Sequence, residues 1–194
     1  MQIELTLENV KDIILILTPI ATFLLALFTI NKWKKEYRGK IYFDCSFRFL
    51  KSVYALRDQF MSMRSAFITA GEQLPREGSY DNYENENTRY YLINRAKPFQ
   101  ETLNVFYSNV PEVEVLLGKE VRELCQNINS VVGKYYMARN EYIQLVGITN
   151  NNEHLKEISK SVFYITDKDE LGDELEKIIK KIERAVSVHL KLIN

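Results

Sequence analysis

Four arginines lie among the apolar residues of amphipathic segments, and their side chains have the clearest capacity to bind a ligand. Arg57 and Arg64 are seven residues apart, which is about two helical turns, and Arg95 and Arg139 have similar apolar neighbours. A guanidinium group holds a phosphate or a carboxylate through two parallel hydrogen bonds. Arg57, Arg64 and Arg139 would therefore form an anion or nucleotide pocket if they converged in the folded chain.

The alternative for these arginines is structural. Carboxylates such as Asp58, Glu101 and Glu141 lie near them in the sequence. A salt bridge to one of these residues would satisfy each guanidinium group within the folded protein. The sequence leaves the pocket and the salt bridges open as two interpretations.

A second set of residues could mediate contacts between helices in a membrane. Thr18, Thr22 and Ala26 are spaced four residues apart in an apolar run, and Thr29 falls on the same side of a helix. Small residues let two helices approach closely, and hydroxyl groups can bond across them. These residues are candidates for self-association or, in a larger ring, for lining a pore, although no charge there marks an ion pathway. A plain anchor with ordinary threonine content would have the same pattern.

Basic residues follow the apolar run directly. Such a cluster fixes the orientation of a membrane span and attracts anionic lipid, at about 1 kcal/mol for each basic side chain near the surface. Trp33 and Tyr37 occupy positions at which aromatic residues anchor a span at the membrane interface. The candidate residues for topology and lipid contact are Lys32, Trp33, Lys34, Lys35, Arg38 and Lys40.

No pattern typical of catalysis or of cofactor binding occurs in the sequence. The chain contains no Walker loop, no nucleophile elbow and no zinc-protease motif, and its seven glycines form no phosphate-binding cradle. Its two histidines and two cysteines are scattered without metal-ligand spacing. We therefore expect no catalytic residues, no cofactor and no metal site, and we expect Cys45 and Cys125 to be reduced and buried.

The charge balance argues against nucleic acid as a partner. Basic and acidic residues number 26 each, so the formal net charge is zero. Residues 1–40 hold six basic and four acidic residues, which leaves 20 basic and 22 acidic residues in the remainder. A slightly acidic domain lacks the basic surface that binds a phosphate backbone, so no nucleic-acid partner is expected.

The apolar run of residues 13–30 is long enough to cross a membrane. It contains no charged residue, and a helix through it covers about 27 Å, close to the thickness of the hydrocarbon core. The preceding lead is acidic and the run lacks a cleavage site, which favours a retained span over a signal peptide. The excess of basic residues after the run predicts a single-pass inner-membrane protein with its N-terminus outside and its C-terminal domain in the cytoplasm.

Everything after the basic segment has the periodicity of amphipathic helices. Apolar residues recur at steps of four and three, which places them on one side of a helix. Long segments of this kind, separated by polar stretches, predict an all-α fold, and the first of them could continue the helix of the span. The segments cover residues 41–71, 89–110, 117–145 and 171–189.

The breaks between these segments define the domain organisation. Residues 1–40 carry the lead, the span and the basic segment, and residues 41–194 are expected to form one antiparallel cytoplasmic bundle of about four long helices. A polar stretch over residues 74–88 predicts a long loop, which either carries function or serves as a connector. The protein is thus expected to have one anchor and one domain.

Two local signals predict where helices begin. Pro111 suits the first turn of a helix, so a new helix is expected to begin there. Thr166, with Asp169 three residues later, resembles a capping box at the start of the last helix.

Short stretches spread over most of the chain carry a resemblance to a family. They are Trp33-Lys34-Lys35 with Gly39, Phe49-Leu50-Lys51, the run Val53–Asp58, Asn94-Arg95 and the acidic amphipathic last segment. Through them the chain resembles a group of uncharacterised bacterial single-pass membrane-anchored proteins with a helical cytoplasmic domain. The resemblance implies an anchor and a helical domain, and it brings no reaction and no site residues. Small anchored proteins of this kind also resemble accessory and defence-associated proteins of bacteria.

Three functions agree with these features. The first is a non-enzymatic, membrane-anchored helical scaffold that self-associates or holds a cytosolic protein partner at the lipid bilayer. The second is a membrane-perturbing effector of bacterial stress or phage defence, triggered through the helical domain, which the threonine-rich face and Pro19 suggest. The third is a sensor of a small anionic ligand that uses Arg57, Arg64 and Arg139.

Overall fold

The computed structural model describes residues 7–75, 83–146, 152–164 and 169–190. Within these ranges the chain is helical and contains no strand, which confirms the predicted all-α class. The elements are α1 (Leu7–Met63), the short 3-10 helix η1 (Ala70–Glu72), α2 (Tyr83–Leu117), α3 (Lys119–Leu145), α4 (Asn152–Val162) and α5 (Glu170–Leu190).

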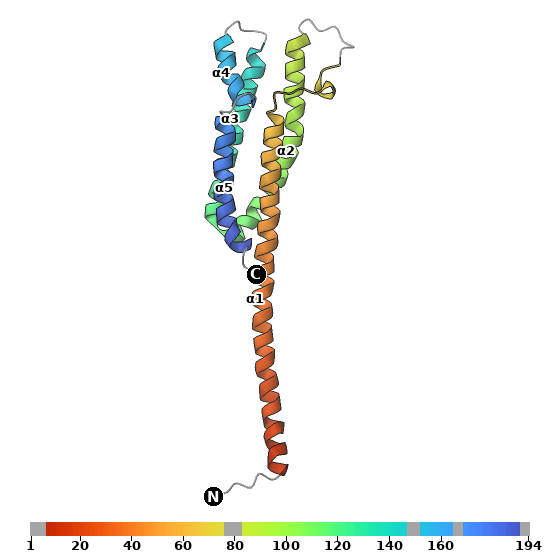
Figure 1. Cartoon of the computed structure of the whole chain (residues 1–194), viewed down its shortest axis with the longest axis vertical. Helices are drawn as coiled ribbons and strands as arrows, with labels where there is room; N and C mark the ends of the chain where they lie inside the picture. Colours follow the sequence, from red (N-terminus) through yellow and green to blue (C-terminus); the bar gives the residue numbers. More distant parts are fainter. Residues whose placement is uncertain (1–6, 76–82, 147–151, 165–168, 191–194) are drawn as a thin grey trace.

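Helix α1 is the longest element and joins the two halves of the molecule. Its 57 residues correspond to about 85 Å of helix. Figure 1 shows its first half standing alone and its second half packed among the other helices. We call residues 7–44 the stalk, and we call residues 45–63 of α1 together with α2, α3, α4 and α5 the head. The helix that contains the apolar run thus continues without a break into the head.

The helices of the head lie side by side and alternate in direction. In Figure 1, α1 rises from the stalk, α2 descends, α3 rises again, and α4 and α5 descend in sequence. Helix α1 contacts α2 and α5, whereas α3 contacts α2, α4 and α5. Two short helices therefore cover the length of α3, because α4 lies beside its distal end and α5 beside its lower part.

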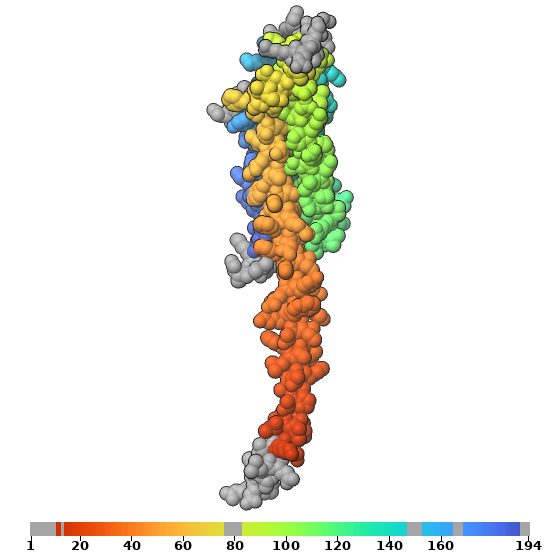
Figure 2. All heavy atoms as spheres, turned by 90° about the vertical axis from the view of Figure 1, so that its right-hand side faces the viewer, coloured from red at the N-terminus to blue at the C-terminus, as the bar shows by residue number. Residues whose placement is uncertain are grey.

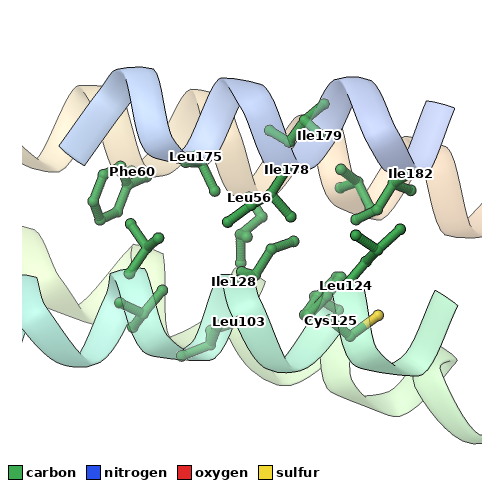
Figure 3. Close-up of a cluster of buried hydrophobic side chains, with 14 of the residues drawn as sticks. Leu56, Phe60, Leu103, Leu124, Cys125, Ile128, Leu175, Ile178, Ile179 and Ile182 are labelled. Atoms are coloured by element: carbon green, nitrogen blue, oxygen red, sulfur yellow. The ribbon is translucent and has the colours of Figure 1, made fainter. Parts of the chain in front are cut away.

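The core of the head consists of the apolar stripes that the sequence predicted. Phe49, Val53, Leu56 and Phe60 of α1 are fully buried. They meet α2, α3 and α5 in one continuous cluster, part of which Figure 3 shows. The labelled side chains of the cluster, which point inward from all four helices, are Leu56, Phe60, Leu103, Leu124, Cys125, Ile128, Leu175, Ile178, Ile179 and Ile182.

A second, smaller cluster lies at the distal end of the head. Tyr91 and Leu92 of α2 pack there against Val162 and Phe163, which lie at the end of α4. This cluster places the end of α4 against α2 and α3.

The break after α2 lies seven residues later than the sequence predicted. Pro98 and Pro111 are both inside α2, so the expectation that Pro111 begins a new helix is wrong. Both prolines are exposed, and each removes one helical hydrogen bond without ending the helix. The chain breaks instead at Gly118, whose φ of 92° is a conformation that side chains other than glycine rarely adopt.

Two other boundaries also differ from the sequence prediction. Helix α1 ends at Met63 rather than near residue 71, and Phe67, an apolar residue of the predicted segment 41–71, is 88% exposed. Helix α2 begins at Tyr83, so the last part of the predicted loop 74–88 is helical. Residues 76–82 of that loop lie outside the described residues.

Candidate functional site

The four small residues of the predicted self-association face are exposed along the stalk. The hydroxyl group of Thr18 donates to the carbonyl of Ile14 at 2.7 Å, and that of Thr22 donates to the carbonyl of Thr18 at 2.8 Å. Thr29 makes the same contact with Leu25 at 2.8 Å. Each hydroxyl proton is therefore used within α1. What this face offers a neighbouring helix, with Ala26 in its middle, is close approach.

The side chains of the predicted basic segment are likewise exposed. Its lysines, Arg38 and Trp33 are all exposed. Trp33 stacks on Tyr37 with ring centroids 5.4 Å apart, and Lys32 lies 3.8 Å from Glu36 in an exposed pair. Lys34, Lys35, Arg38 and Lys40 are thus available to lipid headgroups or to a partner.

Arg57 makes ordinary surface contacts of the structural kind. Its guanidinium group donates to Asp58 at 2.9 Å and lies 3.7 Å from Glu176 of α5. It also covers the ring of Tyr54 at 5.2 Å. The alternative that Arg57 pairs with Asp58 is confirmed.

Arg64 is fully buried where α1, α4 and α5 meet. Its guanidinium group donates two hydrogen bonds to Asp169, at 2.8 and 2.7 Å, and Asp169 is only 7% exposed. Further bonds reach the carbonyls of Ser161 at 3.2 Å and Lys160 at 3.4 Å, in the last turn of α4. The carbonyl of Arg64 in turn accepts the amide of Tyr164 at 2.7 Å.

The geometry around Arg64 joins three helix ends. The positive charge lies at the C-terminus of α4, where the helix dipole is negative. Asp169 directly precedes α5, so its carboxylate lies at the positive end of that helix. The predicted capping box is therefore wrong about Asp169, which lies before the helix rather than in its first turn. Thr166 lies outside the described residues.

Gly172 belongs to the same junction. A Cβ atom built on Gly172 would lie 2.2 Å from Oδ2 of Asp169, far inside contact distance. Only glycine leaves room at this position for the carboxylate that Arg64 holds. Sequence analysis identified neither Asp169 as a partner of Arg64 nor Gly172 as its neighbour. The sequence signal for a close contact between these two residues was a glycine three residues after an aspartate, at the start of an amphipathic segment.

Arg95 fixes the segment that follows α1. Its side chain is 7% exposed and forms a bidentate pair with Glu72, at 2.6 and 3.0 Å, and it also donates to the carbonyls of Ser65 and Phe67. The hydrogen bonds that Glu72 accepts from Arg95 and from the amide of Thr69, at 2.8 Å, lower the pKa of Glu72 to about 2. The sequence placed Arg95 among apolar residues but did not indicate Glu72 as its partner.

Arg139 is the predicted pocket residue that has a buried side-chain nitrogen without a hydrogen-bond partner in the described part of the chain. Its guanidinium group covers the ring of Tyr136 at 4.8 Å and donates to Asn140 at 3.0 Å, but its buried Nε has no partner there. The buried hydroxyl of Tyr135 also has none. Burial raises the pKa of Tyr135 to about 12.

Three of the four arginines act electrostatically on Tyr135. The charges of Arg139, Arg64 and Arg95 act on the Tyr135 hydroxyl and oppose the rise of its pKa. Arg57 is not among these groups, because its contacts face α5. Of the three arginines predicted to form a pocket, Arg139 and Arg64 thus act on Tyr135 and Arg57 does not. The guanidinium group of Arg64 is already bound by Asp169.

Two cavities open on the head. One, of about 560 Å³, lies between α3, α4 and α5 and includes Lys134, Glu157 and Lys160. The other, of about 360 Å³, lies between α1, η1 and α2 and includes Gln59, Asn94 and Arg95. None of the three predicted pocket arginines lines either cavity. The anion pocket remains a prediction.

Neither the arginine contacts nor the stalk can be interpreted through a known relative. No family model, no curated protein and no solved structure matches this chain.

Proposed function

We propose that this protein is a membrane-anchored helical scaffold. In this proposal residues 13–30 of α1 cross the inner membrane once, with the N-terminus outside. The rest of the stalk is a spacer, and the head is an antiparallel helical bundle in the cytoplasm. The scaffold self-associates or holds a cytosolic protein at the membrane, and it performs no chemistry.

The observation that carries this proposal is the exposure of the apolar half of α1. The most apolar window of eighteen residues has a mean hydropathy of 2.2, and none of it is buried. Phe23, Leu25 and Phe28 are each more than 60% exposed. An apolar surface of this length is costly in water but favourable in a bilayer. The helix is long and apolar enough to cross a membrane.

The spacer between the span and the head is rigid in this proposal. Cys45 lies fifteen positions after Ile30 within α1, which corresponds to about 22 Å of helix. Trp33 and Tyr37 suit the lipid interface at the base of this spacer, and the head begins well above it. A partner bound to the head would thus be held at a fixed height above the bilayer.

Membrane extraction and a topology reporter test the proposal. The full chain is expected to stay in the membrane pellet after alkaline carbonate treatment, and a reporter fused after Asn194 is expected to be active only as a cytoplasmic fusion. Leu24→Arg places a charge near the middle of the span, at a cost of about 2.5 to 3.5 kcal/mol. It should reduce the pelleted fraction, whereas the matched control Lys34→Arg should not. Release of the unmodified chain by carbonate, or a reporter outside the cytoplasm, would overturn the proposal.

A further inference from the structure

Two buried hydrogen-bonding groups of α3 lie close together and have no partner among the described residues. They are the hydroxyl of Tyr135 and the Nε of Arg139. Tyr135 is fully buried, and its ring packs edge-on against Phe60 of α1 at 5.6 Å. The two residues are four positions apart, so they lie on the same side of α3. Buried polar groups are normally bonded, because an unbonded one destabilises the folded chain.

The surroundings of the Tyr135 hydroxyl are positively charged. The guanidinium groups of Arg139, Arg64 and Arg95 all oppose the rise of its pKa, and Arg139 has the largest of these effects. Arg64 and Arg95 each form a salt bridge with a carboxylate, so their charges are compensated. The charge nearest in effect to the hydroxyl is therefore that of Arg139.

Arg139 differs from Arg57 in having no counter-ion. Both guanidinium groups cover a tyrosine ring, at 4.8 Å for Arg139 and at 5.2 Å for Arg57. Arg57 also pairs with Asp58 at 2.9 Å. Within the described ranges, the half-buried Arg139 pairs with no carboxylate and donates to the neutral side chain of Asn140 at 3.0 Å. A partly buried positive charge without a counter-ion favours an anion beside it.

The packing of the head limits the size of a ligand at this place. Figure 2 shows the face on which α1 and α2 lie closely side by side, with α3 visible only at its edge. Tyr135 lies behind this face, because its ring contacts Phe60 of α1. Neither Tyr135 nor Arg139 lines either of the two cavities described above. A ligand between them is therefore about as small as a water molecule or a single ion.

We propose that the Tyr135 hydroxyl and the Nε of Arg139 bind one monatomic anion, such as chloride. Both groups donate a hydrogen bond to the anion, and the guanidinium group supplies the opposite charge. A water molecule would accept the same two hydrogen bonds, but it would leave the charge of Arg139 without a counter-ion. The site is independent of the membrane anchor, since both residues belong to the head.

Thermal unfolding of the full chain in detergent, followed by circular dichroism, tests the anion. Sodium chloride replaces sodium gluconate in steps at constant ionic strength, because gluconate has the same charge but is too large for the site. Chloride should raise the unfolding midpoint of the unmodified chain by a few degrees, and the rise should saturate as the site fills. Sodium bromide should act in the same way.

Four variants assign the effect to these two residues. Tyr135→Phe and Arg139→Met each remove one donor and should abolish the response to chloride. Tyr136→Phe removes a hydroxyl that already donates to Gln100 at 3.2 Å, and Arg57→Met removes a guanidinium group that has its own carboxylate. These two matched controls should respond as the unmodified chain does. In gluconate, Tyr135→Phe should be more stable than the unmodified chain, and chloride should narrow this difference.

The outcomes decide between an anion and the other possible ligand. Equal midpoints of the unmodified chain in chloride and in gluconate would overturn the proposal and leave water as the partner of the two groups. A chloride response that Tyr135→Phe retains would place the anion elsewhere on the protein and would also overturn this site. Should Arg139→Met fail to fold, Tyr135→Phe, which keeps the volume of the core, decides alone. Membrane extraction tests the anchor separately, so neither result depends on the other.

Discussion

Arg64, which directly follows α1, holds Asp169, which directly precedes α5, through two hydrogen bonds of 2.7 and 2.8 Å in a buried site. The two residues are 105 positions apart in the chain. Their pairing fixes the helix that enters the head from the stalk relative to the last helix. Because Arg64 also binds the last turn of α4, this one side chain determines how three helices meet.

Removal of one partner of this pair should destabilise the head strongly. Asp169→Ala leaves the charge of Arg64 buried without its counter-ion, which typically costs about 3 to 5 kcal/mol. Asp58→Ala removes the exposed partner of Arg57 and should cost no more than about 1 kcal/mol. Urea unfolding of the full chain in detergent, followed by circular dichroism, measures both. Similar losses in the two variants would contradict a special role for the buried pair.

Two glycine substitutions are expected to have opposite signs. Gly172→Ala brings a Cβ atom onto the carboxylate of Asp169 and should cost about 1 to 3 kcal/mol, as overpacking usually does. Gly133, inside α3, has open space around it, so Gly133→Ala should stabilise the head by about 0.5 to 1 kcal/mol. Thermal unfolding of both variants is the measurement. A stabilised Gly172→Ala variant would show that the carboxylate does not occupy this position.

The pair of Glu72 and Arg95 predicts a pH-dependent contribution to stability. Because the pKa of Glu72 is lowered from 4.5 to about 2 in the folded chain, its contribution is complete above about pH 4.5 and is lost as the pH falls toward 2. Glu72→Gln should therefore destabilise the protein at pH 7, and the difference from the unmodified protein should shrink in acid. In an Arg95→Met background the same substitution should have a smaller effect. A difference that stays constant with pH would contradict this prediction.

The two cysteines should be unreactive in the folded protein. Burial raises the pKa of the Cys125 thiol to about 12 and also raises that of Cys45, so little thiolate is present near neutral pH. A maleimide at pH 8 should label neither residue in native membranes and both in denaturant. Ser130→Cys, which lies on the surface, serves as the positive control. Labelling of the unmodified chain without denaturant would show that the head opens locally.

Two tyrosine substitutions separate a bonded hydroxyl from an unbonded one. The hydroxyl of Tyr135 is buried without a partner among the described residues, so Tyr135→Phe should stabilise the head by about 1 kcal/mol. Tyr54 donates to Glu183 at 2.8 Å, so Tyr54→Phe should cost about 0.5 to 1.5 kcal/mol.

The Tyr135→Phe variant also tests the predicted anion pocket. If Tyr135→Phe destabilised the head and abolished a stabilisation by inorganic phosphate or by nucleotides, Tyr135 and Arg139 would belong to an anion site. Unchanged thermal stability of the unmodified chain in the presence of these anions would argue against the small-ligand sensor.

The sequence by itself determined the helices and their buried sides. The apolar run of residues 13–30 and the stripes led by Phe49, Phe99 and Ile128 follow from local periodicity, because each helix must turn one side toward a core. The helical class and the candidate span were predictable for this reason.

Only the tertiary structure decided the partners of the buried charges and the places where helices end. Arg64 meets Asp169, and Arg95 meets Glu72, across distances in the sequence that periodicity does not report. Pro111 lies inside α2, although its local preference alone suggested that a helix begins there. Which side of a helix becomes buried also depends on where its neighbours pack, and here α2 and α5 cover the side of α1 that carries Phe49, Val53 and Leu56.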